Sequence, residues 1–212
     1  MKYIIFFTLV CWSASALAQT SSKNHPEYFQ LATGISKHGT GDMNGYAISV
    51  DYKRYLRPRT SISIGLTTTI HDGVFQILYT DPNNNPLDGS YRYGTSGIQL
   101  NARMGYSMIR AKHHTLDVQL GALLRYQTSS YYDDLTTLYP PATGLPIPVF
   151  FQVNRSNQRT VSFGSIGAIQ YQYQFVSGDH IGIHGSLQTD TQGDVISMVS
   201  LLIGYRLRQE KN

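Results

Sequence analysis

The residues in this sequence whose types and spacing best suit catalysis are a histidine, a serine and an aspartate near its C-terminal end. His184 and Ser186 are separated only by Gly185, and Asp194 follows shortly afterwards. A serine nucleophile, a histidine base and an acid that orients the histidine are the groups used in acyl transfer. Alternation of polar and apolar residues places His184 and Ser186 on the polar face of their segment. We therefore predict a packed interior position for both and no enzymatic activity.

Metal and cofactor chemistry is not supported by the spacing of the other candidate ligands. Asp81 could open a calcium loop, but Pro86 occupies the position that needs a flexible glycine, and Arg92 stands where the closing glutamate would be. His113 and His114 are adjacent, so their side chains point to opposite faces of a strand or into a turn. We predict no metal site and no cofactor.

The elements that must position these side chains are segments in which apolar and polar residues alternate with a period of two. In the clearest of them, Ile62, Ile64 and Leu66 alternate with serine and glycine, which predicts a strand with two different faces. The chain contains eight such segments, at residues 28–36, 46–53, 61–70, 98–108, 116–126, 161–175, 180–188 and 195–207. The predicted fold class is all-β with eight antiparallel strands.

The links between these predicted strands alternate between short and long. Tight links are expected at residues 57–58, 112–114 and 177–179, and looser links at 37–44, 72–93, 128–158 and 190–193. Outer-membrane barrels have short periplasmic turns and longer outer loops. The rhythm therefore predicts an up-and-down transmembrane β-barrel with both termini in the periplasm. Aromatic residues near the strand ends, such as Tyr52, Tyr55 and Tyr126, predict girdles at the two membrane interfaces.

The N-terminal residues predict export. Lys2 precedes an apolar run, and Ala16 and Ala18 supply the small residues of a cleavage site, so residues 1–18 are predicted to be a signal peptide and 19–212 the barrel domain. The single cysteine lies in that signal peptide, which excludes disulfides and thiolate sites from the mature domain. Only 14% of the residues are charged, against about a quarter in soluble domains, as expected for an apolar exterior and a polar interior.

The residues at inward positions of the alternating pattern are mostly polar or charged, so these side chains are expected to meet in the predicted lumen. An eight-stranded barrel is just wide enough to be filled by side chains, and buried charges require partners. We predict a plugged lumen with a polar network that includes Asp51, Lys53, Arg103, Asp117, Arg125 and His184.

Charges and aromatics outside the lumen suggest where partners bind. Basic residues are expected at the periplasmic rim, and acidic residues beside the outer loops: Lys53, Arg54, Arg57, Arg59, Arg110, Lys112, Arg206, Arg208 and Lys211, against Asp42, Asp72, Asp81, Asp88, Asp133, Asp134, Asp190 and Asp194. The long link at 128–158 contains a possible partner surface that covers the barrel mouth or faces outward, formed by Tyr131, Tyr132, Phe150 and Phe151. No basic stripe with interleaved aromatics indicates nucleic-acid binding.

Taken together, the export signal, the alternating segments, the rhythm of the links and the final run Leu201–Leu207 resemble the superfamily of small outer-membrane β-barrels that includes OmpA-type and OmpX-type barrels. The resemblance covers nearly all of the mature chain and is one of architecture. The tyrosine-rich and asparagine-rich composition also resembles barrel proteins of Bacteroidetes. One departure is the polar tail that follows Tyr205, where such barrels often end on an aromatic residue.

The leading prediction is a non-enzymatic protein of a Gram-negative outer membrane, with a structural or complex-forming role through its outer loops. Its predicted partners are outer-membrane lipid and another outer-membrane or periplasmic protein. Three alternatives stay open. They are a small-solute channel, a lipid A-modifying enzyme suggested by the similarity of His184-Gly185-Ser186 to the His-x-Ser element of lipid A deacylases, and a soluble periplasmic ligand-binding β-barrel whose apolar face points inward.

Overall fold

The computed structural model describes residues 25–39, 43–80, 84, 86–130, 134–145, 148–153 and 158–207. The predicted signal peptide, residues 1–18, lies outside the described residues.

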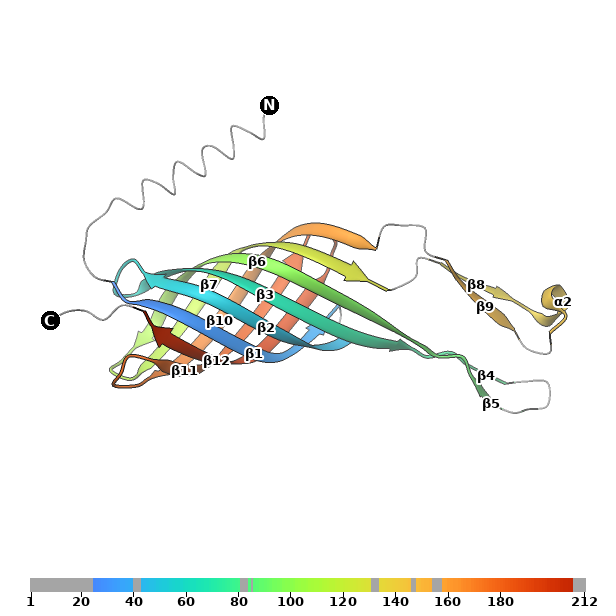
Figure 1. Cartoon of the computed structure of the whole chain (residues 1–212), viewed down its shortest axis with the longest axis horizontal. Coiled ribbons are helices and arrows are strands. Elements are labelled where there is room, and N and C mark those ends of the chain that lie inside the picture. Colours follow the sequence, from blue (N-terminus) through green and yellow to red (C-terminus); the bar gives the residue numbers. More distant parts are fainter. Residues whose placement is uncertain are drawn as a thin grey trace, which may run out of the picture.

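Eight strands close into one antiparallel barrel in the order β1-β12-β11-β10-β7-β6-β3-β2 (Figure 1). The first and last strands close it, with Tyr28 opposite Arg206 and His38 opposite Ile196. The barrel strands are β1 Glu27–His38, β2 Met43–Tyr55, β3 Thr60–Phe75, β6 Tyr91–Arg110, β7 His114–Ser129, β10 Arg159–Gln174, β11 His180–Asp190 and β12 Val195–Arg206. The predicted eight-stranded up-and-down barrel is confirmed, and each predicted segment corresponds to one of these strands.

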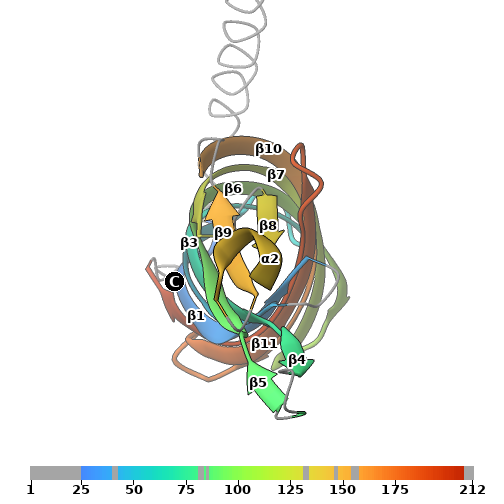
Figure 2. The same ribbon diagram turned by 90° about the vertical axis from the view of Figure 1, so that its right-hand side faces the viewer.

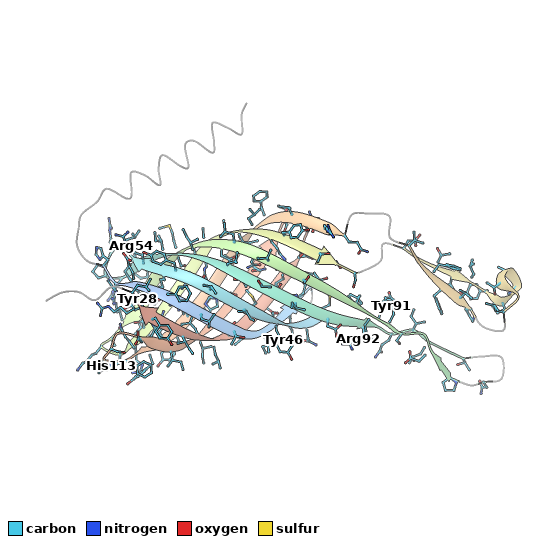
Figure 3. All side chains as sticks on the ribbon, viewed as in Figure 1. Tyr28, Tyr46, Arg54, Tyr91, Arg92 and His113 are labelled. Atoms are coloured by element: carbon cyan, nitrogen blue, oxygen red, sulfur yellow. The ribbon has the colours of Figure 1, made fainter. Side chains whose placement is uncertain are left out.

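The wall of this barrel is apolar outside and polar inside. Outward residues such as Tyr46 and Leu120 are 73% and 69% exposed, whereas inward residues such as Gln99 and Arg125 are buried. Figure 3 shows the side chains that cover the outer wall. An exposed apolar wall of this kind is suited to lipid, since it lacks the polar surface of a soluble protein. The alternative of a soluble barrel with its apolar face inside is therefore wrong.

The inner face is not uniformly polar. Ile196 and Met198 of β12 pack against Ala47 of β2 inside the lumen, which explains why the alternation in the last strand is weak. Tyr55, which we expected in an aromatic girdle, also points inward and is buried, because it shares the parity of Lys53 on β2. That part of the girdle prediction is wrong, whereas Tyr52 and Tyr126 are exposed as expected.

The two ends of the barrel differ. At the turn end, where β1 begins and β12 ends, the strands are joined by the short links 56–59, 111–113 and 175–179. The opposite end, which we call the loop end, has the two long links, 76–90 and 130–158. Two predicted looser links are wrong. Only residues 39–42 separate β1 from β2, and residues 191–194 form a tight turn, in which Gly193 has a φ of 83° and the backbone N–H groups of Gln192 and Asp194 donate to Asp190 Oδ1.

Two further hairpins project beyond the loop end, where the sequence predicted irregular loops. They are formed by β4 Leu78–Thr80 with β5 Pro86–Asp88, and by β8 Asp134–Leu138 with β9 Val149–Val153. A short helix, α2 Pro140–Thr143, lies at the tip of the second hairpin. Viewed from the loop end, β8, β9 and α2 lie in front of the barrel opening, and the side view shows them well beyond it (Figures 1 and 2). None of the helices among the described residues has the length and hydrophobicity to cross a membrane.

Candidate functional site

The lumen contains two buried ion pairs between strands that are not neighbours in the barrel, one joining β2 to β7 and the other joining β2 to β6. Lys53 Nζ donates to Asp117 Oδ2, and Arg103 Nη2 donates to Asp51 Oδ1. All four side chains are at most 5% exposed. Removing an isolated charge from water is very costly, so charges are found at this depth only with partners. Asp117 also accepts hydrogen bonds from Gln172 Nε2 at 3.1 Å and Tyr55 Oη at 3.4 Å.

The third buried cation, Arg125, is held by neutral groups. Its Nε, Nη1 and Nη2 donate to Gln127 Oε1 at 2.8 Å, Gln99 Oε1 at 3.1 Å and Thr69 Oγ1 at 3.0 Å. Gln127 Nε2 in turn donates to Asp194 Oδ2 at 2.7 Å. The guanidinium is therefore connected to a carboxylate at the loop end through one amide.

Amide side chains also pair inside the lumen. Gln119 Nε2 of β7 donates to Gln170 Oε1 of the neighbouring strand β10 at 2.6 Å, whereas Gln99 of β6 exchanges two hydrogen bonds with Gln188 of β11, which is not its neighbour. A void lined by Asp51, Arg103 and His184, among others, has a volume of about 10 Å³. That volume holds about one water molecule. At these levels the side chains fill the barrel. All six residues that the sequence assigned to the lumen are buried there, as two separate ion pairs, the Arg125 group, and His184 beside the void next to Asp51 and Arg103.

The possible catalytic set is not assembled. His184 and Ser186 both face the lumen and are buried. Ser186 Oγ makes no hydrogen bond within the part of the chain that the structure describes. The acid proposed for the set, Asp194, contacts His38 and Gln127 instead.

Four polar side chains at the loop end of the lumen form a cluster that the sequence analysis did not predict. Ser36 Oγ lies 2.9 Å from His71 Nε2, the rings of His71 and His38 are 5.1 Å apart, and His38 Nε2 lies 3.5 Å from Asp194 Oδ2. The only indication in the sequence was that Ser36, His38 and His71 occupy inward positions in the alternating pattern. Ser36 and His71 are buried, and the acid touches His38 rather than the histidine beside the serine. The arrangement therefore connects β1, β3 and the β11–β12 turn, and it does not form a triad.

Most of the described basic residues of the predicted rim lie at the turn end, with one correction. Lys53, which the sequence assigned both to the lumen network and to this rim, lies in the lumen, where it pairs with Asp117. Arg54 lies near Glu27, with Nε and Oε1 3.6 Å apart, and Arg110 packs over the Tyr55 ring with a Cζ-to-centroid distance of 4.5 Å. Figure 3 shows Arg54 at the end where β1 begins. Several predicted charges lie outside the described residues: Asp42, Asp81, Asp133, Arg208 and Lys211.

The predicted partner surface is described only in part. Tyr131 and Tyr132 lie outside the described residues. Phe150 and Phe151 are neighbours on β9, opposite Thr137 and Thr136 of β8, so they lie on opposite faces of the hairpin. The hairpin extends away from the barrel in Figure 1, so the expectation that it packs over the mouth is wrong for these residues.

Among the residues that the structure describes, no three or more histidine, cysteine or acidic side chains are grouped so that they could hold a metal ion.

The comparisons with known proteins show the fold. No protein-family model and no curated protein matches this sequence. Among solved structures, neisserial surface protein A is similar with a TM-score of 0.55 and 8% identity, over 85% of this chain and 97% of that one. Ail of Yersinia pestis is similar with a TM-score of 0.46 and 10% identity, over 86% of this chain and 99% of that one. The N-terminal barrel domain of OprF of Pseudomonas aeruginosa is similar with a TM-score of 0.43 and 11% identity, over 86% of this chain and 100% of that one.

At such low identity the first likeness shows a shared fold alone, and the two lower TM-scores add no argument. The resemblance to Bacteroidetes barrels stays a prediction. The architecture is confirmed: this chain has the fold of the small eight-stranded outer-membrane β-barrels.

Proposed function

We propose that this protein is a non-enzymatic barrel of a Gram-negative outer membrane, oriented with its loop end outside, that anchors a protein-binding hairpin at the cell surface. The projecting β8–β9 hairpin carries this proposal. Asp134 is the single charged residue among the described positions 134–145 and 148–153. A surface loop in water would ordinarily have many more charges.

The apolar side chains of this hairpin are distributed so that the hairpin cannot bury them by itself. Phe150 and Phe151 lie on opposite faces, and Phe151 is 49% exposed. Tyr139 and Leu145, at the tip, are 64% and 49% exposed. An isolated two-stranded hairpin is marginally stable in water. Exposed aromatic residues on a nearly uncharged projection are typical of a protein interface.

A photo-crosslinking residue at Phe151 in intact cells tests the interface. We expect a discrete cross-linked protein, and none when the same residue replaces Ser177 at the turn end. A matched deletion removes residues 131–157 and joins the flanking strands with a short glycine-serine link. The barrel should tolerate this deletion, because Ser129 N–H donates to Gln158 O at 3.0 Å at the base of the loop. No cross-link from Phe151, or equal cross-linking from Ser177, would contradict the proposal.

Two measurements separate the proposed function from the alternatives. In planar bilayers we expect no conductance steps, because the Lys53–Asp117 ion pair and the Gln99–Gln188 amide pair cross the lumen. Regular steps would favour the solute channel. Replacement of Ser186 by alanine should leave the acylation of lipid A unchanged, whereas a change in acylation would favour the enzyme.

A further inference from the structure

A groove of about 890 Å³ lies at the loop end of the barrel, where β12, β1 and β2 meet the extended ends of β3 and β6. We call it the wall groove, because its lining includes outward residues of the barrel wall: Ile35, Lys37, Tyr46, Val74, Arg92 and Val199. Figure 3 shows Tyr46 and Arg92 on the same side of the barrel. Its volume is in the range of sites that enclose a small organic ligand.

The wall groove crosses the line at which the barrel exterior changes from apolar to polar. Ile35 of β1 lies opposite Val199 of β12 and Tyr46 of β2, which form an apolar row. Two residues further along, Lys37 lies opposite Ser197 and Asn44, which form a polar row. Because side chains two apart in a strand share a face, both rows point outward. The groove therefore offers an apolar surface on one side of this line and, on the other, polar groups with the single apolar side chain of Val74 beside Arg92.

The polar side of the wall groove carries cations with little local compensation. Lys37 makes no hydrogen bond or ion pair with another described residue. Arg92 Nη2 donates to Asp72 Oδ2, and these side chains are 75% and 51% exposed. An exposed ion pair contributes little stability. The guanidinium, which has five N–H donors, can thus also bind an anion at a low cost.

We propose that the wall groove binds a phosphorylated lipid of the surrounding leaflet. Its acyl chain lies along the apolar row of Ile35, Tyr46 and Val199, and its phosphate lies between Lys37 and Arg92. A zwitterionic lipid would satisfy the apolar row but would gain less from the two cations. The wall groove is separate from the β8–β9 hairpin. An experiment that disproves lipid binding in the groove therefore leaves the proposed protein-binding role of the hairpin untouched, and the reverse also holds.

The experiment uses the barrel in nanodiscs of phosphatidylcholine that contain lipid A as a minor component. The lipid A that stays bound after extraction into detergent is counted by native mass spectrometry. One Lys or Arg near an anionic surface is worth about 1 kcal/mol, so Lys37→Gln should lower retention about fivefold. Asp72→Asn should raise retention, because it removes the carboxylate that competes for Arg92. This increase cannot come from misfolding.

The matched control is Arg159→Gln, which removes an exposed cation from the loop end of β10, on the other side of the barrel. It should leave lipid A retention unchanged. Equal retention by the wild type and Lys37→Gln, or an equal loss in Arg159→Gln, would overturn the proposal. An excess of inorganic phosphate should not displace the lipid, since it cannot occupy the apolar row. Displacement by phosphate alone would show a simple anion site instead.

Discussion

Gln99 of β6 and Gln188 of β11 exchange two hydrogen bonds across the lumen, with Nε2-to-Oε1 distances of 2.7 and 2.8 Å. These strands are separated in the barrel by β7 and β10, so the pair spans the lumen rather than joining neighbouring strands. We predict that Gln188→Ala destabilises the barrel by about 1–3 kcal/mol, because it leaves the buried Gln99 amide without one partner. Urea unfolding in lipid vesicles measures the change.

The double variant Gln99→Ala/Gln188→Ala isolates the pair, and Gln192→Ala in the exposed β11–β12 turn serves as the control. Contacting residues commonly show an interaction energy of about 0.5–3 kcal/mol in such a cycle. Strict additivity of the two single variants would show that the amides do not interact as the structure has them.

The Lys53–Asp117 ion pair gives a second prediction. Lys53→Met leaves the Asp117 carboxylate buried without its cation, and we expect a loss of about 3–5 kcal/mol in unfolding free energy. The double variant Lys53→Met/Asp117→Leu should recover most of this loss, since well-packed apolar residues can replace a buried pair. Arg54→Met is the control, because Arg54 is a neighbouring cation whose side chain is 45% exposed. A double variant no more stable than Lys53→Met would contradict this account.

The sequence was sufficient to predict the strands and their faces. A strand places alternate residues on opposite sides, and the side that faces lipid must be apolar, so the two faces differ clearly in composition. The same rule placed Lys53 of β2 in the lumen, and applied to Tyr55 it would have placed that side chain there as well. The girdle assignment of Tyr55 and the additional rim assignment of Lys53 were wrong because both treated a position near a strand end as a rim position.

Which inward side chains contact each other in the lumen could not be predicted from the sequence, for a geometric reason. Parity shows that Ser36, His71 and Gln99 point inward, but the strand tilt and stagger decide which inward residues lie at the same level. The pairs Ser36–His71 and Gln99–Gln188 depend on that stagger. The hairpins at the loop end were missed because their strands are too short to show an alternation, and the described strand β5 begins at a proline.

The close approach of His180 to Gly204 gives a third prediction. An ideal Cβ on Gly204 would lie 2.1 Å from two atoms of the His180 ring, which also makes a 2.8 Å hydrogen bond with Gln30 Nε2. Gly204→Ala must therefore displace the ring, and overpacking of this kind costs about 1–3 kcal/mol. Gly185→Ala is the matched control, because a Cβ there meets nothing within 4 Å. Equal stability of the two variants in urea would contradict the packing.

Asp194 connects the β11–β12 turn to the strands around it. Its Oδ2 lies 3.5 Å from His38 Nε2 and accepts a 2.7 Å hydrogen bond from Gln127. The interaction with His38, followed by the bond from Gln127, lowers the pKa of the Asp194 carboxyl from its ordinary value, although partial burial opposes this. A carboxyl with a lower pKa in the folded state stabilises that state above the unfolded pKa, and its contribution disappears as the pH falls through the folded pKa.

We therefore expect protection of the β11–β12 turn to hold from neutral pH to about pH 4, the ordinary range of an aspartate, and to weaken progressively below it. Amide hydrogen exchange of residues 191–195 measures this protection. Asp194→Asn should have less protection at neutral pH and a flatter dependence on acid, because the residue no longer titrates. Asp134→Asn, in the projecting hairpin, should behave as the wild type. If Asp194→Asn lost protection in acid as steeply as the wild type, another group would control the turn.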